Sequence, residues 1–170
     1  MEKYIWIFPL LFIFHDMEEI IGIIPWYQKN QQTLKQKYPK IISLYNNTST
    51  EGFAFAVFEE LVFCITTCVI SLLSGWYGLW FGTFIACTLH FAIHIIQSLI
   101  IKSYIPALIT SIIALPIGLI VIHNSLQSLN YSIELLLIYS ILGIIIILIN
   151  LKFAHKIMEK FTIWQTKKYM

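Results

Sequence analysis

A cluster of ionisable side chains interrupts a long apolar stretch near the start of the chain, and this feature constrains the fold most. His15, Asp16, Glu18 and Glu19 lie in the middle of the otherwise apolar residues 4–27. If the stretch is a helix, His15, Glu18 and Glu19 are spaced i, i+3 and i+4 and share one face. Burying such groups in hydrocarbon costs about 3 kcal/mol each. The rest of the chain must therefore supply partners or a ligand for them.

The chain around this stretch has the composition of an integral membrane protein. Hydrophobic residues make up 58% of it and charged residues 12%, against roughly 45–50% and 25% in soluble domains. Five stretches are long enough to cross a bilayer, which takes about 20 helical residues. We predict an all-α, polytopic membrane helix bundle that forms one domain over residues 1–152. Its five spans lie near residues 4–26, 52–73, 76–101, 105–123 and 133–151.

The lysines lie outside the predicted spans and mainly on one side of the membrane. Ten of the eleven follow the first, third or fifth span, and Lys3 is alone on the other side. The positive-inside rule then places the N-terminus outside and the C-terminus in the cytoplasm. We predict an exposed loop over residues 28–51, with a short interfacial helix as the alternative. Residues 153–170 read as a basic amphipathic tail on the inner leaflet, with one apolar face formed by Phe153, Ile157, Phe161 and Trp164.

The basic residues also indicate where the protein is found. All eleven are lysines, and isoleucine and asparagine are abundant, a bias typical of an AT-rich bacterial genome. We therefore predict a multi-pass protein of the bacterial inner membrane. The expected partners are the lipid bilayer and a lipid or other hydrophobic substrate, with no nucleic acid. The oligomeric state is left open.

Two further spans carry ionisable residues at the depth of the first cluster. Glu59 and Glu60 lie in the second span, and His90 and His94 in the third. Together with the first-span glutamates they lie mostly about seven residues from the same membrane face, or roughly 10 Å below it. Side chains at one depth on consecutive helices can meet in the bundle core. Glu60 shares its helical stripe with small residues suited to a helix interface, so we favour it over Glu59 as the inner residue.

The spacing of the histidines is typical of a metal site. His90 and His94 are four residues apart, the spacing at which one helix brings two imidazoles to one zinc ion. Carboxylates from facing helices build two-metal sites in four-helix bundles. We predict one or two divalent ions (zinc, iron or manganese), bound by His15, Glu19, Glu60, His90 and His94. Cys87 and Gln97 share the histidine stripe, so Cys87 is placed to reach the same pocket.

Three functions are compatible with this cluster. The leading one is a metal-dependent membrane hydrolase that acts on a lipid or other membrane-embedded substrate, with a redox di-iron enzyme as a variant. Its candidate catalytic carboxylates are Glu18, Glu19 and Glu60, and a metal would make a bound water nucleophilic near neutral pH. The alternatives are a small proton-coupled transporter and a scaffold in which the cluster only joins helices. Asp16 is expected beside the ligands or in solvent, and His155 at the membrane interface.

Three parts of the sequence resemble one family. His15-Asp16-Met17-Glu18-Glu19 resembles the signature of the HXXEE-domain membrane proteins, a family named for that motif. The resemblance extends to the histidine pair of the third span. It also includes residues 104–110, which are similar to the family's Tyr-x-Pro-Gly-x-x-Thr stretch, with Ala107 where glycine is usual. It covers roughly residues 14–110, and it implies the membrane architecture and the polar site but no particular reaction.

Overall fold

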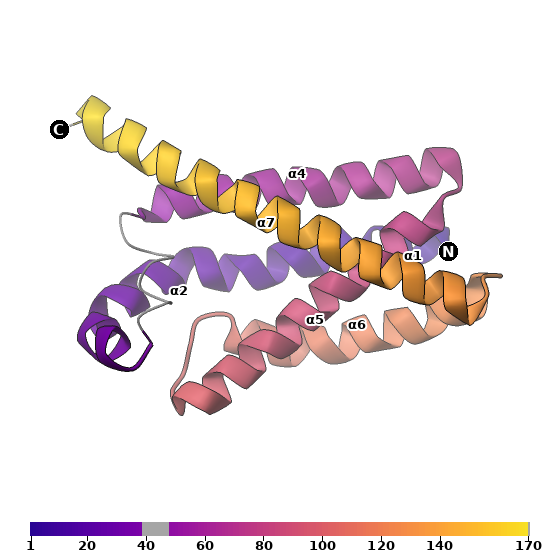
Figure 1. Ribbon diagram of the computed structural model, residues 1–170, viewed down its shortest axis with the longest axis horizontal. Coiled ribbons are helices and arrows are strands. Elements are labelled where there is room, and N and C mark those ends of the chain that lie inside the picture. The colour runs from indigo at the N-terminus through magenta and orange to yellow at the C-terminus, as the bar shows by residue number, and fades with distance from the viewer. Residues whose placement is uncertain (39–47, 170) are drawn as a thin grey trace.

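The computed structural model describes residues 1–38 and 48–169, which form a bundle of helices (Figure 1). The described residues contain no strand, which confirms the all-α fold class. The helices in chain order are α1 (Glu2–Ile5), α2 (Ile7–Lys37), α4 (Thr50–Ser74), α5 (Tyr77–Ile101), α6 (Leu108–Ser128) and α7 (Ile133–Tyr169).

Four of these helices, α4, α5, α6 and α7, are long and apolar enough to cross a membrane. Helix α2 is also long, but Asp16, Glu18 and Glu19 fall within its most apolar part. These three acidic side chains, which belong to the polar cluster noted in the sequence, distinguish α2 from the other four helices. The bundle is therefore membrane-like, with one unusually polar member.

Helix α2 continues well beyond the predicted end of the first span. It runs through Pro25 to Lys37, so the prediction of a loop or separate helix from residue 28 was wrong over residues 28–37. Residues 28–37 contain no glycine or proline and include several glutamines and lysines, which favour helix. The bend of α2 beyond Pro25 (Figure 1) fits the loss of one backbone hydrogen bond there. The rest of the predicted loop, residues 39–47, lies outside the described residues.

Helix α7 runs through residue 152 without a break, so the predicted fifth span and the predicted basic tail belong to one helix. No glycine or proline follows Gly143 in this helix, and nothing in the sequence ends it. The buried face of its last part differs from the predicted apolar face: it is formed by Ala154, Met158 and Thr162. Thr162 accepts a hydrogen bond from the Ser49 backbone at 3.2 Å, just before α4 begins. The end of α7 is thus attached to α4.

Helix α5 crosses α7 at two glycines (Figure 1). A methyl group on Gly82 would overlap the backbone of α7, and one on Gly143 would overlap the backbone of α5. Small residues allow this close approach, as in many membrane bundles. The crossing fixes α7 against α5 near one end of the bundle, and α7 then passes the polar residues of α5 on its way to α4.

The connection between α5 and α6 places the start of α6 beside α2. Lys102 and Ala107 have positive φ values of 55° and 88°, which turn the chain sharply after α5. Trp26 Nε1 donates a hydrogen bond to the Tyr104 carbonyl at 2.8 Å, and the ring of Pro106 packs against Gly22. As a result the first turn of α6 faces the polar part of α2.

Candidate metal centre

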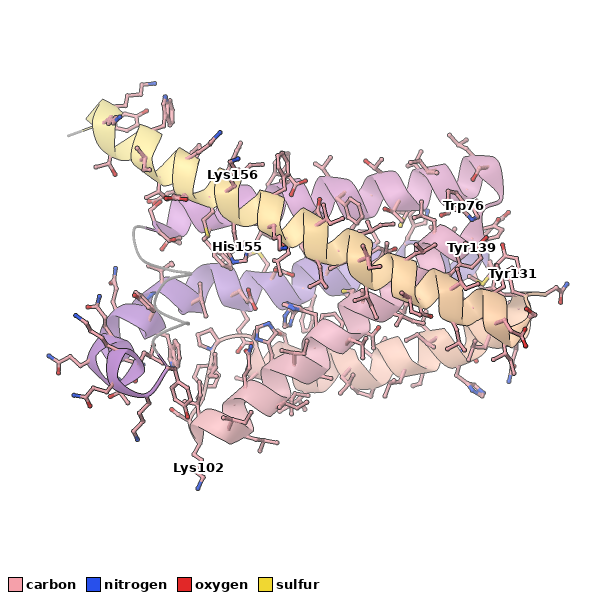
Figure 2. All side chains as sticks on the ribbon, in the orientation of Figure 1. Trp76, Lys102, Tyr131, Tyr139, His155 and Lys156 are labelled. Carbon is pink, nitrogen blue, oxygen red and sulfur yellow. The ribbon has the colours of Figure 1, made fainter. Side chains whose placement is uncertain are left out.

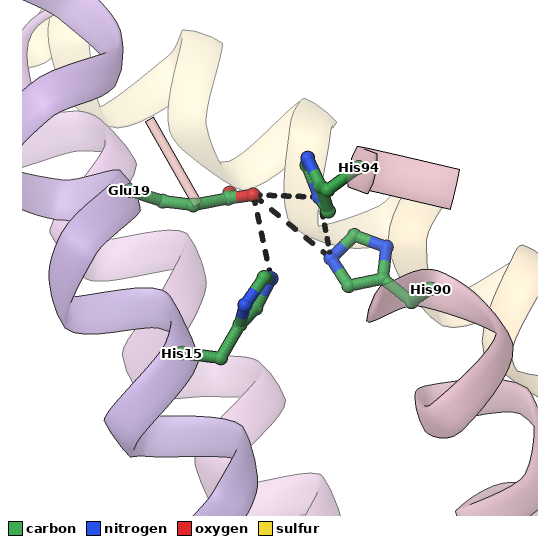
Figure 3. A group of neighbouring side chains, drawn as sticks. All are labelled: His15, Glu19, His90 and His94. Carbon is green, nitrogen blue, oxygen red and sulfur yellow. Dashed lines mark hydrogen bonds and ion pairs between the residues drawn. The ribbon is translucent and has the colours of Figure 1, made fainter. Parts of the chain in front are cut away.

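Four side chains from two helices meet inside the bundle (Figure 3). His15 and Glu19 are one turn apart on α2, and His90 and His94 are one turn apart on α5. Glu19 Oε1 lies 2.8 Å from His94 Nε2, 3.7 Å from His15 Nε2 and 3.9 Å from His90 Nε2. The Nε2 atoms of His90 and His94 are 3.0 Å apart. The structure thus brings together four of the five predicted ligands.

The spacing of these atoms fits a single divalent ion. One ligand atom from each residue can be chosen so that all four lie within 4.8 Å of one another. An ion with ligands at about 2.0–2.2 Å in tetrahedral geometry separates them by roughly 3.3–3.6 Å, within the range of the contacts here. Three imidazole nitrogens and one carboxylate oxygen suit zinc, iron or manganese. The donor set and its spacing therefore fit a metal.

Two of the atoms that face this point lack a hydrogen bond. His15 Nε2 is buried with no partner, and so is Glu19 Oε1, whose 2.8 Å contact with His94 does not give it a hydrogen bond of acceptable geometry. Leaving buried polar atoms unsatisfied costs roughly 1–3 kcal/mol each. A cation between them would satisfy both atoms at once.

Thr110 on α6 determines which nitrogen of His15 faces the cluster. The Thr110 hydroxyl donates its shortest hydrogen bond, 2.7 Å, to the Glu18 carboxylate. Its lone pairs are then left for His15 Nδ1 at 3.2 Å, which favours the neutral His15 tautomer with the proton on Nδ1; the Ser111 hydroxyl, 3.4 Å from the same nitrogen, can accept from it as well. His15 Nε2 therefore presents a lone pair to the centre of the cluster. Histidines that bind metals are commonly held in this way through their second nitrogen.

Glu18 itself faces α6 instead of the histidines. It accepts hydrogen bonds from the Tyr104 hydroxyl at 2.6 Å and from the Thr110 backbone N–H at 2.8 Å, besides the Thr110 hydroxyl. Helix α6 begins at Leu108, so this carboxylate lies where free amides and the helix dipole favour negative charge. The structure therefore places Glu18, one of the predicted catalytic residues, beside α6 and outside the four-residue cluster. It holds the start of α6 and, through Thr110, orients His15.

A cavity of about 250 Å³ lies beside the cluster. His90, His94 and Glu19 form part of its wall, and Asp16 and Glu60 line it as well. Glu60 is not one of the four clustered residues, so its predicted part as a ligand of the same ion does not follow from the geometry. The apolar part of the wall comes from α4, α5 and α7 and consists of Phe53, Ala56, Val57, Ile93, Leu151, Ala154 and Met158.

The structure also separates the paired residues of α4. Glu60 lines this cavity and a smaller one of about 60 Å³ next to it, whereas Glu59 accepts a hydrogen bond from Asn150 at 3.4 Å. The preference for Glu60 as the inner residue agrees with this arrangement. Cys87 lines the smaller cavity together with Glu60 and His90, and not the cavity beside the four-residue cluster.

Sequence reasoning missed the position of one residue of the site and left that of another open. His155 was placed at the interface but lines the larger cavity, because α7 continues past residue 152. Its Nδ1 lies 2.8 Å from the Leu151 carbonyl, which leaves Nε2 without the proton. Asp16 is only 3% exposed and lines the same cavity as Glu19, which agrees with the expected position beside the ligands and excludes the alternative position in solvent. The uninterrupted helical sequence after residue 152 was the signal that could have placed His155.

The fold and the site together define a membrane-like, all-helical protein with a histidine and glutamate group that can hold a metal ion. A family described as proteins of unknown function with an HXXEE motif matches residues 6–121, and the chain belongs to this family. The matched region includes the motif, the histidine pair of α5 and the start of α6, and it ends before α7. No curated protein and no solved structure matches the chain.

The structure shows why the parts of the resemblance belong together. Tyr104 and Thr110, the first and last residues of the stretch before and within α6, both donate hydrogen bonds to Glu18 of the HXXEE motif. The remaining motif residues, His15 and Glu19, meet the two histidines of α5. One motif thus joins α2 to two other helices through different side chains.

Proposed function

We propose that the protein is a metal-dependent membrane hydrolase that acts on a lipid or another membrane-embedded substrate. The observation that carries this proposal is the convergence of His15, Glu19, His90 and His94 on one point next to a cavity. A scaffold needs no such convergence, since any buried hydrogen bond can join two helices. Nor does it need two buried atoms left without hydrogen bonds.

Each residue of the cluster has a separate task in this proposal. The three histidines and Glu19 hold one divalent ion, and the hydrogen bond from His15 to Thr110 fixes the direction of one ligand. A bound divalent metal supplies a nucleophilic water near neutral pH. Glu60 lines the cavity next to this point, where a carboxyl group can exchange a proton with the substrate's leaving group.

The cavity supports a substrate that stays partly in the bilayer. Its volume of about 250 Å³ is below the roughly 300–1,000 Å³ of pockets that enclose whole drug-sized ligands. Its wall combines several aliphatic side chains and Phe53 with a few polar groups. Such a space can hold the bond to be cleaved and its neighbouring atoms, while acyl chains remain among the helices or in the lipid.

We infer a topology of five spans, with α2 as the first, the N-terminus outside and the C-terminus in the cytoplasm of a bacterial inner membrane. Lys102 and Lys156 lie toward one end of the bundle, while Trp76, Tyr131 and Tyr139 lie toward the other (Figure 2). The position of the two lysines at one end supports placing that end on the cytoplasmic side. The metal centre would then lie in the cytoplasmic half.

Elemental analysis of the detergent-purified protein tests the metal centre directly. We expect close to one equivalent or more of zinc, iron or manganese in the wild type, and its loss in His15→Ala and His94→Ala. His123→Ala is the matched control, because His123 on α6 contacts Gln127 instead of the cluster. A wild-type protein without metal, even after growth in supplemented medium, would contradict the proposal and favour a proton-coupled carrier.

The reaction is tested with the metal-loaded protein in vesicles of bacterial lipid extract. We expect mass spectrometry to detect released head groups or fatty acids, with release abolished by a chelator and by His94→Ala and restored by adding the metal. Bound iron without hydrolysis of any lipid class would instead favour the redox variant of the enzyme.

A further inference from the structure

The larger cavity holds three carboxylates next to the metal centre. Asp16, Glu19 and Glu60 all line it, and they interact electrostatically with one another. Asp16 and Glu19 are one turn apart on α2, and Glu60 comes from α4 on another side of the cavity. Among the described residues, no lysine lines this cavity, and the chain contains no arginine. The described side chains therefore provide no permanent positive charge for this group.

Asp16 is the member of this group that points most clearly to a ligand. Asp16 is only 3% exposed, and its Oδ2 atom is buried without a hydrogen-bond partner. A buried carboxyl group whose oxygen has no donor is disfavoured unless a proton or a nearby cation neutralises it. The other wall residues offer no ammonium group, and the three histidines of the first site direct their Nε2 atoms toward Glu19.

Glu19 is placed to join two ions. All three contacts with the histidines are made by Oε1, so its second oxygen is available for another ligand. Carboxylates shared in this way occur in the two-metal sites of helical bundles, where the ions lie about 3.5–4 Å apart. His155 on α7 adds a nitrogen donor on the same cavity wall, since its Nδ1 is engaged with the Leu151 carbonyl.

We propose that Asp16, Glu60 and the second oxygen of Glu19 form a second, oxygen-rich site for a divalent cation beside the histidine site, with His155 as a further ligand. Carboxylate oxygens suit manganese and magnesium better than soft metals. This inference rests on the proposed function, because Glu19 belongs to both sites. It goes further by predicting a two-ion centre with one nitrogen-rich and one oxygen-rich position.

Manganese titration of the chelator-stripped protein in detergent distinguishes the two sites. We expect two equivalents of Mn²⁺ per chain in the wild type, with an electron paramagnetic resonance spectrum of two coupled ions. Asp16→Asn and Glu60→Gln should each bind one equivalent and give the spectrum of an isolated ion. Glu59→Gln should still bind two, because Glu59 is the neighbouring glutamate but does not line the cavity.

Each possible failure gives a different metal stoichiometry. One equivalent in the wild type, lost in His94→Ala, would overturn the second site and leave the first intact; Asp16 and Glu60 would then share a proton. No bound manganese, zinc or iron in the wild type would overturn both sites. Two equivalents that persist in Asp16→Asn and Glu60→Gln would also overturn the assignment of these residues.

Discussion

Glu18 and Glu19 are neighbours in the chain, yet α2 presents them to two regions of opposite character. On the side of α6, Glu18 accepts hydrogen bonds from the Tyr104 hydroxyl and from the backbone and hydroxyl of Thr110. On the side of α5, Glu19 Oε1 is surrounded by three histidine nitrogens and has no hydrogen bond of acceptable geometry. The first region is complete as a hydrogen-bonded structure, and the second is not.

This difference separates a structural carboxylate from one suited to a ligand. A carboxylate at the start of a helix gains from the free amides and the dipole, and needs nothing more. A carboxylate that faces the lone pairs of several imidazoles is stabilised only when protons or a cation lie between them. His15 belongs to both regions, because its Nδ1 faces Thr110 while its Nε2 faces Glu19. The α6 side therefore orients a ligand for the α5 side.

The largest effects are expected when each glutamate is replaced by glutamine. The Glu19 variant should mainly lose metal, whereas the Glu18 variant should mainly lose stability. Glu19→Gln should reduce bound metal at least tenfold, and it should leave the metal-free protein as stable or more stable, because an amide avoids a buried charge. Glu18→Gln should instead lower the free energy of unfolding by about 1–3 kcal/mol through weakened hydrogen bonds to a charged group. It should retain metal with an affinity reduced about 10–100-fold.

Metal content and thermal unfolding of the chelator-stripped protein, measured on both variants, check this contrast. Identical losses of stability with no loss of metal in Glu19→Gln would show that both glutamates are structural. Loss of metal in Glu18→Gln alone would reverse the roles assigned to the two residues.

A smaller effect is expected from the hydroxyl that links the regions. Thr110→Val keeps the shape of the side chain but removes the donor to Glu18 and the acceptor for His15 Nδ1. We expect metal affinity to fall about tenfold, with restoration in Thr110→Ser. Nitrogen NMR of labelled histidine should show that His15 is protonated at Nδ1 in the wild type and loses this preference in Thr110→Val. An unchanged tautomer and affinity in Thr110→Val would contradict the link.

Much of the site could be predicted from helical spacing alone. The histidines of α5 are four residues apart, as are His15 and Glu19 on α2, so each pair had to share a helix face. Their common depth then indicated that the two faces meet. The direction of Glu18 could not be obtained in this way, because positions i+3 and i+4 both lie near the face of His15. It depends on the start of α6 lying beside α2, which results from the turn after α5.

The C-terminal part of the fold was harder to predict from the sequence, for a different reason. Lysines after residue 152 indicate a membrane surface, and they led to the prediction of a separate tail. Charge does not end a helix, however, and the described residues after Gly143 contain nothing that does. Because α7 continues, His155 lines the cavity and Thr162 contacts the chain before α4. Charged residues indicate where a helix leaves the membrane, whereas glycine, proline and capping residues indicate where a helix ends, and the two positions need not coincide.

The smallest expected effect concerns the backbone that holds the α6 side in place. Ala107 precedes α6 with φ = 88°, a left-handed conformation that costs a residue with a Cβ atom about 1–2 kcal/mol and costs glycine little. Ala107→Gly removes this cost but also one buried methyl group, so we expect the free energy of unfolding to rise by up to about 1 kcal/mol. Ala114→Gly in the interior of α6 is the matched control, since Ala114 is also fully buried, and it should lower the free energy of unfolding by about 1 kcal/mol or more.

Thermal unfolding of both variants in the same detergent measures the difference, and equal destabilisation would show that the turn before α6 is not strained. If Ala107→Gly is the more stable, the strained turn limits how firmly α6 holds Thr110 against Glu18, and metal affinity should not fall in that variant.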